Sequence, residues 1–194
     1  MTGEGGESPA RGRARERAIL AAVVGLLGEV GYEAMTMDAV AARAHASKTT
    51  IYRRWPGKED LLLDAVACLK APLPEPRGLS VRDDLLALLE AMCEQFADPC
   101  HMREFALLLG EGAAYPRLMT RYTETVIEPR REVIRAVLRR GAVTGELRED
   151  IDVDAALFMM IGSVLARSRY GDAPVEPGYA RRVVDEMLSG IGAR

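Results

Sequence analysis

The sequence is poor in aromatic side chains and in cysteine. Aromatic residues make up only 5% of the 194 residues, so a hydrophobic core must consist mainly of leucine, alanine, valine and methionine. The three cysteines, Cys68, Cys93 and Cys100, are an odd number and form no C-x-x-C motif. This argues against a disulfide scaffold and for a reducing compartment. The longest apolar run, residues 18–28, is too short to span a bilayer and is ended by Glu29. We therefore expect a cytoplasmic protein with no membrane contact.

Signals for β-strands and for enzyme motifs are also missing. No stretch alternates between apolar and polar residues with period two, and no hairpin signal is present. The sequence contains no P-loop and no G-x-S-x-G motif, and the early GEGG follows no strand. His45 and His101 fall in different predicted domains, which leaves no general base beside a nucleophile. We expect neither catalysis nor a cofactor.

A metal or thiol sensor stays open as an alternative. Cys93, Cys100 and His101 lie close together in the sequence. Their spacing matches no zinc pattern, and a fourth ligand is not evident. We therefore assign no metal ligands.

Charge is distributed unevenly along the chain. Residues 11–58 carry nine Lys and Arg against four Asp and Glu, whereas residues 59–194 carry 17 against 23. A basic segment on an otherwise acidic protein favours local contact with a polyanion. A randomly uneven surface is the alternative.

Helical periodicity and capping residues predict an all-α chain of nine helices. The expected helices cover residues 13–30, 37–44, 48–55, a segment around 61–69, 80–97, a segment after Asp98-Pro99, 116–143, a segment from 152 and residues 177–191. Thr36, Ser47 and Asp152 have the residue types of N-caps. Gly31 is expected to stop the first helix, and Pro129 to kink the long seventh one. Residues 1–10 are expected to be a disordered tail, and the proline-rich stretch 71–79 a linker.

The second and third predicted helices form a helix-turn-helix. A three-residue turn, His45 to Ser47, joins them, and such units place the second helix in the DNA major groove. Ile51 and Trp55 lie four residues apart and share a face that can pack inward. The remaining polar side chains are the candidate DNA contacts. Thr49 and Thr50 suit bases or phosphates, Arg53 suits guanine, and Lys48 is also directed away from the core. The residues that suit phosphate oxygens are Thr36, Tyr52, Arg54 and Lys58. The alternative is a solvated amphipathic helix.

Residues 13–69 resemble the N-terminal domain of TetR-family transcriptional repressors. The stretches GYEAMTMDAVAARA and SKTTIYRRWPGKEDLL carry the resemblance, and the segment from Arg130 to Tyr170 resembles one large subgroup more loosely. The resemblance implies a dimeric, all-α regulator that binds a palindromic operator and releases it when a small ligand enters the C-terminal domain. It also implies a DNA-binding domain over residues 11–70 and a ligand-binding and dimerisation domain over 71–194.

Two residues depart from the family pattern. His45 stands where the family usually has glycine, in a turn that often needs left-handed geometry, and Gly57 stands where a capping serine is usual. We expect His45 to tolerate the left-handed conformation better than a β-branched residue would. Gly57 is expected to cap its helix weakly.

The C-terminal half is rich in soft apolar side chains. Those expected to line a ligand cavity are Met92, Phe96, Met102, Phe105, Met119, Tyr122, Met159 and Met160. Ordinary core packing is the alternative for each of them. The eighth helix is apolar nearly all round and the ninth has a broad apolar stripe, so both are expected to form a homodimer interface. A regulator of the same fold that answers to a partner protein is a further alternative.

Overall fold

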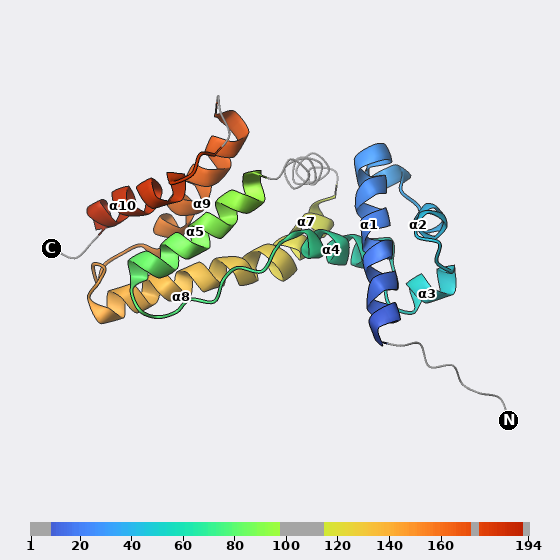
Figure 1. Ribbon diagram of the computed structural model, residues 1–194, viewed down its shortest axis with the longest axis horizontal. Helices are drawn as coiled ribbons and strands as arrows, with labels where there is room; N and C mark the ends of the chain where they lie inside the picture. Colours follow the sequence, from blue (N-terminus) through green and yellow to red (C-terminus); the bar gives the residue numbers. More distant parts are fainter. Residues whose placement is uncertain (1–8, 98–114, 172–174, 192–194) are drawn as a thin grey trace. The chain divides into compact units, whose positions relative to one another are not determined.

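The computed structural model describes residues 9–97, 115–171 and 175–191, and every regular element in these ranges is a helix (Figure 1). The expected helix after Asp98-Pro99, the cavity candidates Met102 and Phe105, and the sensor candidates Cys100 and His101 lie outside the described residues. The all-α prediction is confirmed. None of the described helices has the length and apolar character that a membrane span needs.

The helices follow one another in the predicted order. They are α1 (Pro9–Ala34), α2 (Met37–Arg43), α3 (Lys48–Tyr52), α4 (Lys58–Leu69), α5 (Val81–Ala97), α7 (Pro116–Tyr122), the π-helix η1 (Thr123–Ile127), α8 (Glu128–Thr144), α9 (Val153–Tyr170) and α10 (Tyr179–Ile191). Helix α3 is shorter than predicted. The N–H groups of Arg54 and Trp55 both donate to the carbonyl of Ile51, at 3.0 and 2.9 Å, so the chain tightens into turns before Pro56.

The predicted caps are present where a side chain can supply them. Oxygen atoms of Thr36, Ser47 and Asp152 accept backbone N–H bonds at 3.1, 3.2 and 2.9 Å, respectively. Gly57 makes no such bond, so α4 begins with the weak cap that its sequence predicts. Gly31 interrupts α1 at φ 76° and ψ 173°, a conformation that glycine adopts at little steric cost.

The described chain divides into two compact units. Residues 9–70 and 115–121 form the first, and residues 71–97 and 122–191 form the second. In the first unit, α1 packs against α2 and α4, and α2 against α3. Its core includes the buried side chains of Val23, Leu27, Ile51, Trp55 and Leu61.

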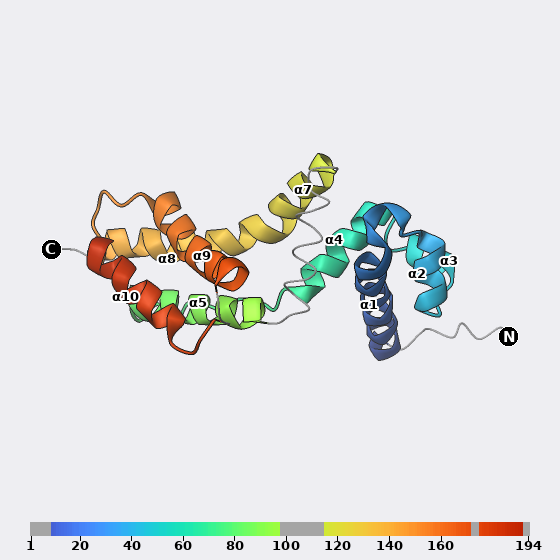
Figure 2. The same cartoon turned by 90° about the horizontal axis from the view of Figure 1, so that it is seen from above.

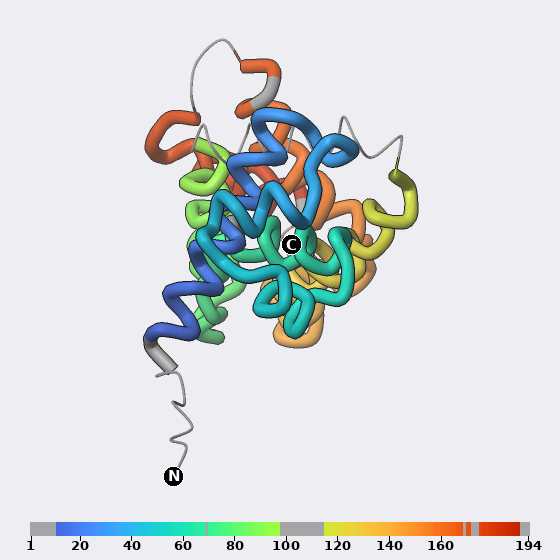
Figure 3. Tube along the Cα trace, turned by 90° about the vertical axis from the view of Figure 1, so that its right-hand side faces the viewer, coloured from blue at the N-terminus to red at the C-terminus, as the bar shows by residue number. Residues whose placement is uncertain are grey.

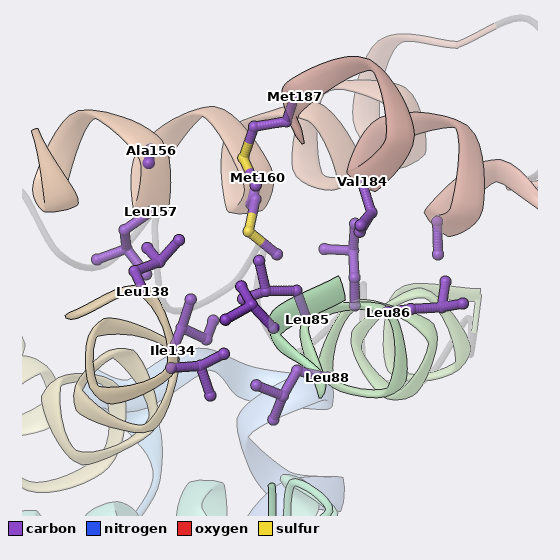
Figure 4. Close-up of a cluster of buried hydrophobic side chains, with 14 of the residues drawn as sticks. Leu85, Leu86, Leu88, Ile134, Leu138, Ala156, Leu157, Met160, Val184 and Met187 are labelled. Carbon is purple, nitrogen blue, oxygen red and sulfur yellow. The ribbon is translucent and has the colours of Figure 1, made fainter. Parts of the chain in front are cut away.

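The second unit is a bundle in which α5, α8, α9 and α10 pack on one another (Figure 2). Each helix contributes aliphatic or methionine side chains to a shared core (Figure 4). The residues labelled in that view are Leu85, Leu86, Leu88, Ile134, Leu138, Ala156, Leu157, Met160, Val184 and Met187. Burying one leucine completely contributes roughly 1.5–3 kcal/mol, so these aliphatic and methionine side chains stabilise the bundle although the fully buried members of the core include no aromatic residue.

The predicted long helix over 116–143 is interrupted before its proline rather than at it. The interruption is the π-helical turn Thr123–Ile127, and Pro129 lies in the first turn of α8. Proline has no N–H to give to the carbonyl four residues earlier, and its ring collides with that carbonyl. The preceding turn therefore widens, and Pro129 occupies the helix start that suits it.

Candidate nucleic-acid interface

The turn between α2 and α3 is closed by two backbone hydrogen bonds. The N–H of Ala46 donates to the carbonyl of Ala41 at 3.0 Å, and the N–H of His45 donates to Ala42 at 3.3 Å. This pair of bonds is the Schellman arrangement, which requires a left-handed residue after the helix end. His45 is that residue, with φ 50°, and it is the only non-glycine residue with positive φ among those described. The left-handed geometry expected at His45 is therefore confirmed.

Helix α3 has one buried face and one exposed face. Ile51 and Trp55 are 0% and 2% exposed, and the indole N–H of Trp55 donates to Asp64 on α4 at 2.8 Å. Lys48, Thr49, Tyr52 and Arg53 are exposed. Packing thus fixes the inner face of α3 and leaves its polar side chains available to a partner.

Several of the predicted DNA contacts already have protein partners. The ammonium of Lys48 pairs with Asp38 at 2.6 Å, and the hydrogen bond between them raises the pKa of Lys48. The hydroxyl groups of Thr50 and Ser47 are 2.8 Å apart, and the Thr36 hydroxyl caps α2. The Thr36 hydroxyl accepts a bond as a cap and keeps its own O–H to donate to a phosphate, whereas in the contact between Ser47 and Thr50 either hydroxyl can be the donor.

Arg54 and Lys58 hold the domain together in the free protein. The Arg54 guanidinium pairs with Glu16 of α1 at 2.5 Å and lies 5.5 Å from the Trp55 ring centroid. The Lys58 ammonium donates to the carbonyl of Glu33 at 3.1 Å and lies over the Tyr32 ring. Contact of either residue with phosphate remains a prediction, and it would require an exchange or sharing of these partners.

The predicted cavity residues within the described ranges belong to two different units. Met92 belongs to the bundle core, Phe96 packs against that core, and Met119 is half-buried on α7 in the first unit. Met159 is 60% exposed on α9, so its side chain is not enclosed within its own protomer, and its role in ligand binding stays a prediction. The neighbouring Met160 is fully buried, because residues one position apart on a helix face different sides.

Tyr122 is the predicted cavity residue with the most unusual environment. It is 2% exposed, and its hydroxyl group has no hydrogen-bond partner among the described residues. Burial raises the pKa of Tyr122 to about 12, although the positive charge of Arg130 acts in the opposite direction. Arg130 itself donates to the carbonyl of Ala71 at 2.8 Å and to the Gln95 side chain at 2.9 Å. The sequence did not predict these polar contacts, because Arg130 lies 59 residues after Ala71 and 35 residues after Gln95.

The cysteine chemistry gives the sensor alternative little support. Burial, together with the negative charges of Glu90 and Glu94, raises the pKa of Cys93 to about 11. The thiol is therefore protonated near pH 7 and is a poor nucleophile and ligand. Within the part of the chain that the structure describes, no three His, Cys, Asp or Glu side chains are grouped as metal ligands.

Comparison with known proteins covers both units. The family described as "Bacterial regulatory proteins, tetR family" matches residues 19–65, and "Tetracyclin repressor-like, C-terminal domain" matches residues 75–187. An uncharacterized HTH-type transcriptional regulator of Mycobacterium tuberculosis is 31% identical over 90% of this chain and 86% of its own. The DNA-binding transcriptional repressor TetR of Mycobacteroides abscessus is 31% identical over 92% of this chain and 94% of its own.

A solved structure is similar to this chain in fold as well as in sequence. The TetR family transcription regulator SCO0332 is 32% identical, covers 93% of this chain and 98% of its own, and superposes with a TM-score of 0.67. These relatives are named as transcriptional regulators, and regulators of this family bind DNA and act as dimers. Sequence, helix-turn-helix and comparisons agree that the chain belongs to the TetR family of transcriptional regulators.

Proposed function

We propose that the protein is a ligand-responsive repressor that binds a palindromic operator as a homodimer. The observation that carries the proposal is the two-faced helix α3. Ile51 and Trp55 anchor it, while Lys48, Thr49, Tyr52 and Arg53 remain exposed. A short helix held from behind, with a hydroxyl-rich and basic outer face, suits base edges and phosphates of the major groove. Because operator DNA is cytoplasmic in bacteria, the proposal also places the protein there.

An exposed, uncharged stripe along α9 supports dimerisation through this helix. The exposed residues that recur at helical spacing are Ala155, Met159, Gly162, Ala166 and Tyr170. Small residues let a second helix approach closely, and Met159 supplies adaptable apolar surface. Beside the stripe, a hollow of about 480 Å³ between α9 and α10 is lined by Met159, Tyr179 and Val183. A twofold dimer across α9 and α10 would cover both features and present two copies of α3 to a palindrome.

Tyr122 supports response to a small effector. A buried hydroxyl group without a partner costs roughly 1–3 kcal/mol, and a ligand with a hydrogen-bond acceptor could remove that cost. Met92 and Phe96 on α5 provide apolar surroundings in the same unit. We therefore propose an effector that is largely apolar and carries at least one acceptor. The chain passes from one unit to the other at residues 70–71 and at the end of α7, between Arg121 and Tyr122. We propose that effector binding in the second unit changes operator binding by the first through these two connections.

Selection of bound DNA from a random pool tests the DNA-binding proposal. We expect a palindrome whose half-sites are centred about one helical turn, ~34–36 Å, or a related spacing apart. Arg53→Ala should lose about 1–3 kcal/mol on the preferred site and relax the preference at one or two base pairs. Tyr52→Phe removes only a hydroxyl group from the same helix and should weaken all sequences alike. Recovery of non-repeated sites only, or an unchanged base preference in Arg53→Ala, would count against the proposal.

A further inference from the structure

We infer that α1 contributes a second DNA-binding surface, a basic groove beside the recognition helix that takes the sugar-phosphate backbone of the operator. The inference rests on the proposed DNA-binding function and enlarges its interface. The groove is a hollow of about 450 Å³ in the first unit. Its walls are the amino-terminal part of α1, with Arg13, Arg15 and Glu16, and the turn that follows α3, with Arg53 and Arg54. Figure 3 shows α3 beside the amino-terminal half of α1.

The charges in this groove do not cancel. Four arginines line it against one glutamate, and Glu16 is already paired with Arg54 at 2.5 Å. Arg13 and Arg53 are exposed on its rim, and basic side chains outnumber the one acidic side chain that lines the groove. Guanidinium groups bind phosphate oxygens through two parallel N–H donors, and arginine is the residue that proteins favour for this purpose.

The position of the groove beside the recognition helix indicates that the phosphate groups it binds belong to DNA. The groove shares Thr50, Arg53 and Arg54 with the predicted recognition surface, so a backbone strand beside the reading helix would continue into it. Arginines recur at every second position from 11 to 17, ahead of the buried Ile19. On a helix this spacing spreads them around its surface rather than along one face, so only Arg13 and Arg15 line the groove. The other two, Arg11 and Arg17, are not part of the inferred surface.

We expect the groove to increase the affinity for DNA without affecting which base sequence is preferred. Each phosphate contact contributes to the salt dependence of binding, with a slope of about −0.9 per neutralised phosphate, and carries no base information. In the full-length protein, Arg13→Ala/Arg15→Ala should therefore lower the slope of log K against log salt by roughly two per protomer. The base preference found by selection should stay the same. Phosphate-ethylation interference should lose protected positions flanking the half-site.

The test uses the selected operator and a random-sequence duplex of equal length, measured by fluorescence anisotropy at several salt concentrations. The matched control is Arg139→Ala/Arg148→Ala, which removes two exposed arginines from the second unit and should leave both slopes unchanged. Circular dichroism confirms that each variant is folded. An unchanged slope and unchanged ethylation pattern in Arg13→Ala/Arg15→Ala would overturn the inference.

Three outcomes that contradict different parts of the argument can be told apart. The protein alone could bind inorganic phosphate saturably and lose this binding in Arg13→Ala/Arg15→Ala, while the salt dependence of DNA binding stays unchanged. This result would make the groove a site for free phosphate and would overturn the inference. Absence of any DNA binding by the unmodified protein would defeat the proposed function itself. Operator binding with normal base preference, but with no dependence on Arg13 and Arg15, would defeat only the groove.

Discussion

His45 occupies a backbone conformation that costs most side chains free energy. Its φ of 50° is required by the Schellman turn between α2 and α3. A non-glycine residue in the left-handed region costs roughly 1–2 kcal/mol, so His45→Gly should raise the free energy of unfolding by about 1 kcal/mol. His45→Val should lower it, because a β-branched side chain fits this region worst. Urea denaturation of the three proteins measures both effects, and equal midpoints would show that the turn is not strained.

Asp84 is the buried carboxylate of the second unit. It is 3% exposed and accepts hydrogen bonds from the N–H groups of Arg77 and Gly78, at 2.7 and 2.9 Å, while Arg140 pairs with it at 2.8 Å. Burial alone would raise its pKa, but the bonds from Arg77, Arg140 and Gly78 outweigh burial and lower it. The carboxylate thereby fixes the end of the linker against α5 and α8.

Removing the charge of Asp84 should therefore destabilise the second unit. Asp84→Asn leaves Arg140 without its partner and should lower the free energy of unfolding by about 3 kcal/mol at pH 7. Because the folded-state pKa is lowered, the stabilisation is present above the ordinary carboxyl pKa, near 4, and is lost as the pH falls through the folded value. Denaturation curves from pH 7 to pH 3 should accordingly converge for the two proteins. A constant difference across that range would exclude the charge as the cause.

At the scale of elements, helix α7 is attached to the start of α4. Arg121 donates to Asp60 at 2.7 Å and to Glu59 at 3.4 Å, and the Tyr115 ring meets the Tyr32 ring edge-on at 4.7 Å. The charged groups are more than one-third exposed, so solvent screens them and the pair adds little to the free energy of unfolding. Its effect is local, since it orders one helix end.

Arg121→Ala should consequently change local order more than global stability. We expect faster hydrogen exchange in peptides covering 116–122, because the first turns of α7 lose an anchor. The urea midpoint should hardly change. Arg117→Ala, on an exposed position of the same helix, is the matched control and should leave exchange unaltered. Unaltered exchange in Arg121→Ala as well would mean that the tyrosine contact alone holds α7.

The contrast between caps and long-range pairs shows what the sequence could predict. Thr36, Ser47 and Asp152 act on N–H groups three residues away, so their roles follow from local pattern. The pairs of Arg121 with Asp60 and Arg54 with Glu16 join residues 61 and 38 positions apart, and no periodicity encodes such pairs. The exposed face of α3 was predictable because Ile51 and Trp55 fix its inner face. The engagement of Lys58 with α1 was not.

At the scale of the whole molecule, the same limit affected the expected ligand cavity and dimer face. Soft apolar residues were assigned to a cavity by composition, but composition does not say which side of a helix each one occupies. Met160 faces the bundle core and Met159 faces outward. On α10, Val184 and Met187 are buried in the protomer's own core. Less of this helix than expected is therefore left for a partner, and a charge at Val184 would unfold the protomer rather than separate two of them.

Met159 gives a sharper test of the dimer. Met159→Glu places a charge on the exposed stripe of α9 without touching the core, so the protomer should remain folded by circular dichroism. Light scattering should then show a monomer, because an unpaired charge is costly to bury in an apolar interface. Operator affinity should fall with it, since one protomer reaches only one half-site.

The matched control for Met159→Glu is Val143→Glu, an 87% exposed apolar residue on α8, which should remain a dimer with normal affinity. If Met159→Glu is still a dimer, the interface lies elsewhere than on this stripe. If Met159→Glu is a monomer that binds the operator as tightly as the unmodified protein does, the affinity does not depend on two paired α3 helices. The proposal of a palindromic operator bound by a dimer would then be wrong.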